Sequence, residues 1–208
     1  MDDKTRELAM RYMQKASERN PRSGKFSKSL PESQEQMAAL LLGSYGAVVA
    51  SRGMDLMLDY PTVAKVEKVV KWMYESRKRG LLLCGTLGNG KTTMLKALKN
   101  LIGANAVYLE AQAVYDYFKQ YQNLPEIPQD CVLLIDDLGV EPSSYNDFGE
   151  KRYPLTELLM RRYKDNLTTV IATNKTFEQI GETYGDRLQD RMREMFALIT
   201  YIEPSYRR

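Results

Sequence analysis

Histidine is absent from the 208-residue sequence, and cysteine occurs only twice. Cys84 and Cys131 lie in apolar segments without CxxC spacing, so we expect two buried free thiols and no zinc site. Long apolar runs are also missing, because none reaches the roughly 18–20 residues that a membrane-spanning helix needs. The charged N-terminus, residues 1–15, lacks the apolar core of a secretory signal. These absences predict a soluble cytoplasmic protein that does not bind a membrane.

The composition is that of one ordinary globular domain with a modest extension, with 43% hydrophobic and 27% charged residues. The net charge of +3 is unevenly distributed, because residues 1–30 contain eight Lys or Arg and only four Asp or Glu. This basic arm has two interpretations. It is either a solvated extension or a segment that contacts nucleic acid or an acidic partner.

The N-terminal part of the chain contains no catalytic motif and divides into two segments. Residues 1–32 have weak helical periodicity followed by a stretch rich in Pro, Gly and Ser, which predicts a basic helix and a linker. Residues 33–79 predict a helical segment that leads into the remainder of the chain. Its first helix is expected to begin at a capping box formed by Ser33 and Gln36.

Glycine and proline set the expected limits of the helices in this segment. Gly43 and Gly46 lie inside the first helix and predict a kink or an early end. Pro61 suits the first turn of a second helix, because the proline nitrogen has no hydrogen to leave unbonded there. Apolar residues then recur at helical spacing until Gly80, where we expect that helix to end.

Strand and helix patterns alternate from residue 81 onward, which predicts a parallel sheet with crossover helices. The expected strands are 81–84, 106–110, 131–136, 168–173 and 197–203. The expected helices are 91–101, 111–121, 154–165 and 184–194. The pattern therefore indicates a three-layer α/β/α domain with a five-stranded sheet.

The segment GTLGNGKTT at 85–93 matches the phosphate-binding pattern G-x-x-x-x-G-K-[ST]. Backbone N–H groups of such a loop point inward around phosphate oxygens, which glycines permit because they tolerate positive φ. The loop residues are Gly85, Thr86, Leu87, Gly88, Asn89, Gly90, Lys91, Thr92 and Thr93. Lys91 is expected to reach the β and γ phosphates of ATP, and the Thr92 hydroxyl to bind Mg²⁺.

Coincidence is the competing explanation for this match, because a glycine-rich turn can fit the expression by chance. The surrounding pattern argues against it. A buried strand ends one residue before Gly85, and a helical pattern begins inside the loop. We therefore predict a nucleotide site at residues 85–93.

Acidic and amide side chains follow two of the predicted strands. Asp136 and Asp137 end an apolar strand, at the sheet edge where open parallel sheets bind ligands. We expect Asp136 to hold Mg²⁺ and Asp137 to orient the attacking water. Asn174 ends the strand 168–173 and would lie beside the acidic pair if the two strands are neighbours. Ordinary turn chemistry is the alternative explanation for all three residues.

The order of these motifs resembles that of AAA+ ATPases, and their wording is similar to the DnaC/DnaI/IstB family. The matching segments are GLLLCGTLGNGKTT at 80–93, LLIDDLGVE at 133–141, IATN at 171–174, YGDRLQDRMRE at 184–194 and SYR at 205–207. The resemblance covers about residues 80–208 and implies an AAA+ core of the P-loop NTPase fold there. The chain stops soon after its last predicted strand, so we expect no C-terminal lid domain, and Arg207 is a candidate to replace part of the lid's function.

The resemblance also implies ATP-dependent assembly into a homo-oligomer, in which neighbouring subunits complete each other's active sites. Arg191 aligns with the family's arginine finger, and Arg187 is the second candidate. The alternative is structural, because Arg191 and Glu194 form an i,i+3 pair of opposite charge on one exposed helix. AAA+ enzymes commonly have Asp-Glu where this chain has Asp136-Asp137, which suggests slow or partner-stimulated hydrolysis.

Initiator-type AAA+ proteins bind single-stranded DNA with the help of the segment that follows the second strand. Here that segment is AQAVYDYFKQYQ, at 111–122. Its aromatic residues Tyr115, Tyr117, Phe118 and Tyr121 could stack on bases, with Lys119 near a phosphate. Aromatic residues at a spacing of three or four are also common in helices that pack on a core.

The leading functional expectation is a helicase-loader-like ATPase that uses ATP and Mg²⁺ and brings a replicative hexameric helicase to single-stranded DNA. An IstB-like transposition helper, with a transposase as its partner, is the rival within the family. A nucleotide-gated adaptor that hydrolyses little ATP is the rival from another class.

Overall fold

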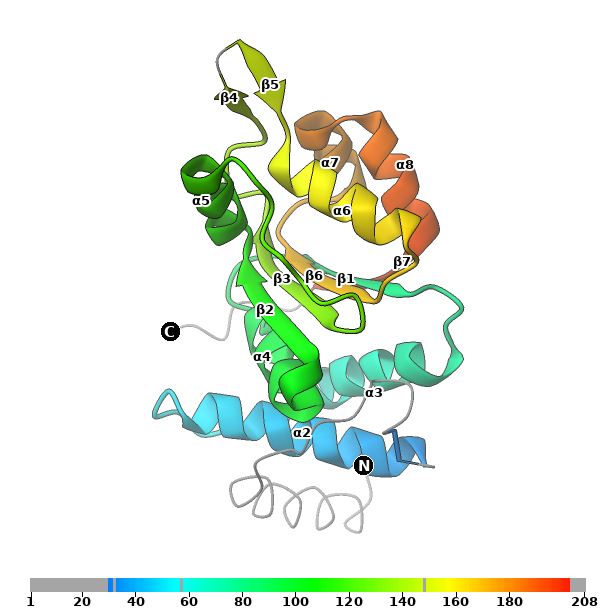
Figure 1. Cartoon of the computed structure of the whole chain (residues 1–208). Coiled ribbons are helices and arrows are strands. Elements are labelled where there is room, and N and C mark those ends of the chain that lie inside the picture. Colours follow the sequence, from blue (N-terminus) through cyan, green and yellow to red (C-terminus); the bar gives the residue numbers. More distant parts are fainter. Residues whose placement is uncertain (1–29, 32, 57, 148, 203–208) are drawn as a thin grey trace.

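The computed structural model describes residues 30–31, 33–56, 58–147 and 149–202 (Figure 1). The basic helix and most of the linker predicted for residues 1–32 lie outside these ranges, as does Arg207. None of the described helices is both long and apolar enough to cross a bilayer.

A five-stranded parallel sheet forms the centre of the structure (Figure 1), as the alternating pattern predicts. The order of its strands across the sheet is β2-β3-β6-β1-β7. Their bounds are β1 Gly80–Gly85, β2 Ala106–Glu110, β3 Val132–Leu138, β6 Thr169–Thr173 and β7 Phe196–Tyr201. The strand that ends in the acidic pair therefore adjoins the strand that precedes Asn174, as expected.

Helices cover both faces of the sheet and complete a three-layer α/β/α arrangement (Figure 1). One face carries α2 Gln34–Ala50, α3 Tyr60–Glu75 and α4 Lys91–Ile102. The other carries α5 Ala111–Tyr121, α6 Pro154–Lys164, α7 Phe177–Tyr184 and α8 Asp186–Met195. A short 3-10 helix, Gly103–Asn105, joins α4 to β2. In the part of the chain that the structure describes, β7 is the last element.

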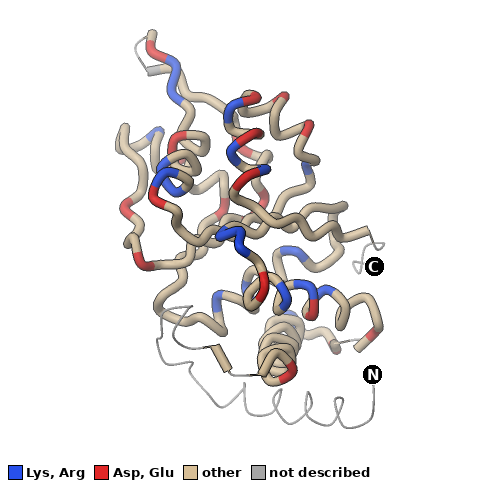
Figure 2. Tube along the Cα trace, turned by 90° about the vertical axis from the view of Figure 1, so that its right-hand side faces the viewer, with Lys and Arg blue, Asp and Glu red and all other residues tan. Residues whose placement is uncertain are grey.

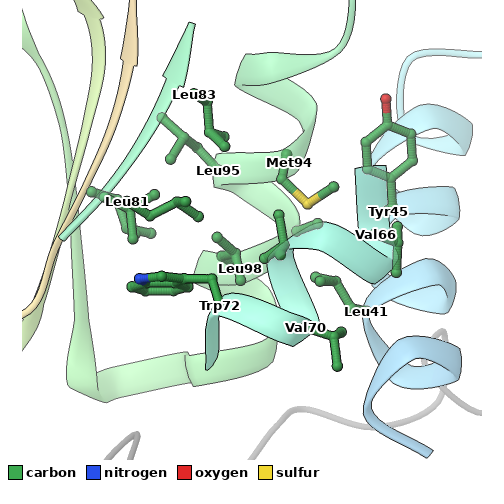
Figure 3. Packing of buried hydrophobic residues seen from close by; sticks show 14 of the residues in the cluster. Leu41, Tyr45, Val66, Val70, Trp72, Leu81, Leu83, Met94, Leu95 and Leu98 are labelled. Atoms are coloured by element: carbon green, nitrogen blue, oxygen red, sulfur yellow. The ribbon is translucent and has the colours of Figure 1, made fainter. Parts of the chain in front are cut away.

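Two hydrophobic cores lie on opposite faces of the sheet because side chains alternate along each strand. Leu81 and Leu83 of β1 enter the core beneath α2, α3 and α4, whereas Leu82 enters the core on the other face. Figure 3 shows Trp72 of α3 beside Leu81 within the first core. The indole nitrogen of Trp72 donates a hydrogen bond of 3.1 Å to the carbonyl of Lys78, which satisfies its polar group.

Helix α2 begins where the sequence predicts, but it does not break at its glycines. The Ser33 hydroxyl accepts a hydrogen bond of 3.4 Å from the backbone N–H of Gln36. The expected early end at Gly43 or Gly46 is wrong, because α2 continues through both glycines to Ala50. Both glycines are buried, and the neighbouring Ser44 hydroxyl donates a 2.9 Å hydrogen bond to the α4 carbonyl of Ala97. Tertiary packing therefore outweighs the low helix propensity of glycine.

Other boundaries also differ from the predictions. Helix α3 ends at Glu75 rather than at Gly80, which instead begins β1. A Cβ at residue 80 would lie 2.6 Å from a ring atom of Phe196, so this glycine permits close packing of the strand. Helix α7 was not predicted, nor was the hairpin of β4 Tyr145–Asp147 and β5 Glu150–Arg152 that projects from the top of the molecule in Figure 1.

Candidate nucleotide-binding site

The glycine-rich loop lies between the end of β1 and the start of α4, at the carboxyl edge of the sheet. Gly88 has φ of +80° and Gly90 has φ of +94°, a region that favours glycine. A Cβ at Gly85 would overlap the carbonyl oxygen of Tyr201 and lie 2.7 Å from the side-chain nitrogen of Asn89. The loop thus provides a backbone concavity at the N-terminus of α4, which favours an anion.

The ammonium group of Lys91 lies inside this loop and is buried. It donates hydrogen bonds of 2.7 Å to the carbonyls of Gly85 and Thr86, and one of 3.2 Å to the side-chain oxygen of Asn89. The neighbouring Thr86 and Leu87 are exposed. The lysine is therefore held at the place where the motif requires a positive charge.

The side chains predicted to hold Mg²⁺ are in direct contact. The Thr92 hydroxyl donates a hydrogen bond of 3.2 Å to one carboxylate oxygen of Asp136, which is buried at the end of β3. The Tyr108 hydroxyl donates a 2.6 Å bond to the other oxygen. Burial, and then the bond to Asp136, raise the pKa of Tyr108, so this hydroxyl remains a donor. Sequence reasoning missed Tyr108, although the alternation of side chains along β2 and β3 places it on the same face of the sheet as Asp136.

Asp136 and Asp137 differ in exposure, and β3 contains a bulge where they lie. Ile135 pairs with Ile171, but Leu138 pairs with Thr173, so β3 has one residue more than β6 over this interval. Asp137 has φ of +53° and is exposed, whereas Asp136 is buried. Strand alternation therefore allows Asp136 to face Thr92 while Asp137 lies at the surface, next to the bulge.

Asn174 is exposed at the same edge of the sheet, directly after β6. It lines a shallow pocket with Gly139, Val140, Lys175 and other residues of the β3–β4 connection and α7. The strand end is anchored, because the Thr173 hydroxyl donates a 2.6 Å hydrogen bond to the carbonyl of Leu138. Strand order thus places Asn174 beside the segment that follows the acidic pair.

Glu141 stabilises that segment and was not singled out by the sequence. It is buried, and its carboxylate accepts a hydrogen bond of 2.9 Å from the N–H of Gly139 and another from the hydroxyl of Tyr184 on α7. Burial raises the pKa of Glu141, while these hydrogen bonds and the charge of Lys175 oppose that shift. The contact joins the loop after Asp137 to α7.

Helices α2 and α3 each contribute one side chain that contacts the phosphate loop. The Tyr45 hydroxyl of α2 lies against Gly90. The Lys65 ammonium of α3 donates a 3.2 Å hydrogen bond to the carbonyl of Asn89 and lies 4.9 Å from the centre of the Tyr201 ring. These contacts join residues far apart in the sequence, so no local pattern indicates them.

Arg191 is not near the phosphate loop of its own chain. Helix α8 leads into the beginning of β7, at the opposite edge of the sheet. The Arg191 guanidinium lies 3.1 Å from the carboxylate of Glu194 and 5.3 Å from the centre of the Tyr163 ring. Arg187 lines the same open groove between α6 and α8. Charges of both signs alternate along the upper helices in Figure 2.

The aromatic helix α5 has a buried face and an exposed face. Phe118 is fully buried, so the suggestion that it stacks on bases is wrong. Tyr115 packs edge-on against Tyr145 of the hairpin, with 6.3 Å between ring centres. Tyr117 and Tyr121 are exposed, and their rings lie 4.6 Å apart. Tyr117 and Tyr121 are therefore the exposed aromatic residues of α5.

The residues present fit a nucleotide with Mg²⁺. The loop has glycines with positive φ at 88 and 90, a buried lysine, and a hydroxyl–carboxylate pair formed by Thr92 and Asp136. No cluster of three or more Asp, Glu or Cys side chains suited to a metal occurs among the described residues. Two protein ligands with water and phosphate oxygens are the usual surroundings of nucleotide-bound Mg²⁺.

Comparison with known proteins identifies one family. The model described as "ATPase family associated with various cellular activities (AAA)" matches residues 81–196. No curated protein gives a significant match.

Three of the solved structures that resemble the chain are a DnaI structure and two DnaA structures. A crystal structure of DnaI has 24% identity and a TM-score of 0.49, over 74% of this chain and 88% of that one. AMPPCP-bound DnaA from Aquifex aeolicus has 18% identity and a TM-score of 0.49, over 70% of this chain and 48% of that one. Domain III of Thermotoga maritima replication initiation protein DnaA has 16% identity and a TM-score of 0.49, over 72% of this chain and 65% of that one.

The segment that matches the AAA family extends from β1 to the first residue of β7. It contains the phosphate loop, the acidic pair and Asn174, and it exceeds half of the 208 residues. The five-stranded parallel sheet is consistent with that match. The chain therefore belongs to the AAA family of ATPases.

Proposed function

We propose that the chain is a helicase-loader-like ATPase that binds and hydrolyses ATP with Mg²⁺ and brings a replicative helicase to single-stranded DNA. The observation that supports ATP use most directly is the 3.2 Å contact between the hydroxyl of Thr92 and the carboxylate of Asp136. This pair lies beside the buried Lys91, so one site combines a metal-binding pair with a phosphate-binding cation.

Each residue of the site has a separate part in the proposed mechanism. The N–H groups of residues 85–93 surround phosphate oxygens, and Lys91 exchanges its carbonyl partners for the β and γ phosphates. Thr92 and Asp136 would hold Mg²⁺, and the bound ion would supply positive charge to the transferred phosphoryl group. Asp137 orients the attacking water from the exposed side of the bulge, and Asn174 assists from the neighbouring strand.

Oligomerisation is part of the proposal because Arg191 lies at the sheet edge opposite to its own phosphate loop. A guanidinium there can reach a transferring phosphoryl group only in another subunit. Arg191 would have to leave Glu194, to which it is now bonded, whereas Arg187 is exposed in the same groove. We propose Arg191 as the finger and retain Arg187 as the second candidate.

The motif resemblance to the DnaC/DnaI/IstB family, rather than the geometry of the site, supports the choice of partner. Single-stranded DNA would contact Tyr117 and Tyr121 of α5, with Lys119 beside them. An IstB-like helper would bind a transposase in place of a helicase.

The nucleotide-gated adaptor is favoured by one observation. Asp137 replaces the longer glutamate common in AAA+ enzymes, and its φ of +53° is uncommon for a residue other than glycine. A short and locally constrained base is consistent with a protein that binds ATP and releases little phosphate without a partner.

Steady-state phosphate release, measured with and without single-stranded DNA, tests the proposal. We expect slow release by the wild-type protein, stimulation by DNA, and loss of activity in Lys91→Ala. Mixing Arg191→Ala with Asp136→Asn subunits should restore some activity, because each variant then supplies what the other lacks. Background release under all conditions, together with tight ATP binding, would favour the adaptor. Affinity capture with ATP that recovered a transposase and no helicase would exclude the loader.

A further inference from the structure

Arg52 lies in a well-defined turn that follows α2. The N–H of Arg52 donates a 3.1 Å hydrogen bond to the carbonyl of Val49, and the N–H of Gly53 donates a 2.9 Å bond to that of Ala50. Gly53 has φ of +70°, the left-handed conformation that commonly ends a helix. The turn therefore fixes the backbone from which the Arg52 side chain extends.

The Arg52 side chain reaches the first turn of the phosphate-loop helix. Its Nη1 atom donates a hydrogen bond of 3.1 Å to the hydroxyl of Thr93, the third residue of α4. Thr93 is buried, whereas Arg52 is exposed. A guanidinium has five N–H donors and stays charged at any physiological pH, and the bond to Thr93 uses one donor.

The cationic side chains near the N-terminus of α4 favour the binding of an anion. The N-terminus of a helix carries about half a positive charge, so cations there are disfavoured unless an anion compensates them. The first turn of α4 contains no acidic residue, yet Lys91, Arg52 and Lys65 all bring cations to the loop or its helix. Within the described residues no carboxylate forms an ion pair with Arg52. A bound phosphate chain would add negative charge beside these cations.

The position of Thr93 indicates which phosphate Arg52 would contact. Thr92 faces Asp136, and the next residue of an α-helix is turned by about 100° around its axis. Arg52 therefore lies on the side of α4 away from the Mg²⁺-binding pair. If the γ end of a phosphate chain lies at Thr92 and Asp136, its other end would extend toward Thr93.

We propose that Arg52 is a nucleotide-binding residue that contacts the α-phosphate of ATP or ADP from the turn after α2. This inference rests on the proposed function, because it assumes that residues 85–93 bind a nucleotide. It makes the N-terminal helical segment part of the nucleotide site itself. Arg52 is a binding residue for both nucleotides and has no direct part in γ-phosphate transfer.

Calorimetric or fluorescence titration of the full chain with ATP and with ADP tests the inference without measuring turnover. We expect Arg52→Ala to bind both nucleotides at least tenfold more weakly, and by similar factors, because both carry the α-phosphate. Arg52→Lys should recover part of the affinity. Arg77→Ala, which removes an exposed arginine beyond the far end of α3, is the matched control and should bind like the wild type.

Arg52→Gln separates phosphate binding from a merely structural role. Glutamine keeps a polar amide on a shorter side chain but has no charge, so we expect its nucleotide affinity to stay low. Its melting temperature without nucleotide should stay near that of the wild type, because Arg52 is exposed and donates one hydrogen bond to Thr93. Full affinity in Arg52→Gln, unchanged affinity in Arg52→Ala, or weakening for ATP alone would overturn the inference. A wild-type protein that bound neither nucleotide would overturn the proposed function and this inference together.

Discussion

The hydroxyl of Tyr45 lies where a Cβ on Gly90 would have to be, so a residue of the N-terminal helical segment limits what the phosphate loop can contain. Gly90 also has φ of +94°, which side chains rarely adopt. Two independent constraints, one steric and one conformational, therefore act on the same glycine.

Replacement of Gly90 by alanine is expected to reduce nucleotide affinity at least tenfold, since the loop must shift to accommodate the new methyl group. Tyr45→Phe removes the clashing hydroxyl but leaves the backbone conformation unchanged. The double variant should therefore remain weak, because a left-handed residue other than glycine costs about 1–2 kcal/mol. Titration with ATP measures both variants. Full recovery in the double variant would show that the steric contact alone matters.

Mg²⁺ should increase the ATP affinity of the wild type by a factor at least ten times larger than it does for Asp136→Asn. The reason is that an amide binds the ion less strongly than a carboxylate. The measurement compares ATP affinity in Mg²⁺ with that in EDTA, and affinity in EDTA should hardly change. Asp130→Asn alters an exposed aspartate in the loop before β3 and serves as the control. An unchanged Mg²⁺ dependence in Asp136→Asn would contradict the proposed metal site.

The buried Glu141 predicts a pH-dependent stability. Burial raises the pKa of its carboxyl in the folded protein, although Tyr184, the N–H of Gly139 and Lys175 favour the ionised form. The folded protein then binds this proton at a higher pH than the unfolded chain does. Its stabilising contribution is present at low pH and is lost as the pH rises through the raised pKa.

Denaturant unfolding of the wild type and Glu141→Gln between pH 4 and pH 8 checks the sign. The stability of the wild type minus that of the variant should be greatest at the acidic end and should fall as pH rises. Glu182→Gln changes an exposed carboxylate on the same helix as Tyr184 and should show no such trend. A difference that increases with pH would mean that hydrogen bonds, rather than burial, control this group.

Tyr121→Ala is expected to weaken single-stranded DNA binding by about 1–3 kcal/mol if one base stacks on this ring. Tyr117→Ala should have a similar effect, because both rings are exposed and adjacent. Fluorescence anisotropy with a labelled oligonucleotide measures the change, and Tyr60→Ala, at an exposed tyrosine on α3, is the control. Equal affinities for all variants would place the DNA contact elsewhere or exclude it.

Local patterns were sufficient to predict most of the fold. The expected strand 106–110 and helix 111–121 coincide with β2 and α5. Their ends carry strong signals, because the apolar residues at 106–109 mark a strand and helical periodicity begins directly after it. The phosphate loop was equally easy to predict from the sequence, since its glycines and lysine occupy a fixed spacing in one short segment.

Short elements and long-range contacts were harder to predict. Helix α7 has eight residues and a capping box of Thr176 and Gln179, a signal that was present in the sequence but overlooked. The bulge at Asp136 and Asp137 depends on the pairing between β3 and β6, which the sequence of β3 alone does not indicate. Tyr45 and Lys65 reach the loop through tertiary packing.

The N-terminal helices α2 and α3 share a hydrophobic core with the AAA segment. Leu41 of α2 and Val66 of α3 belong to the same core as Met94 and Leu98 of α4, and Figure 3 shows these side chains together. A fragment that started at Gly80 would present that face of α4 to water and should aggregate on expression. We therefore expect that a soluble fragment must include α2 and begin near Ser33, well before the phosphate loop at residues 85–93.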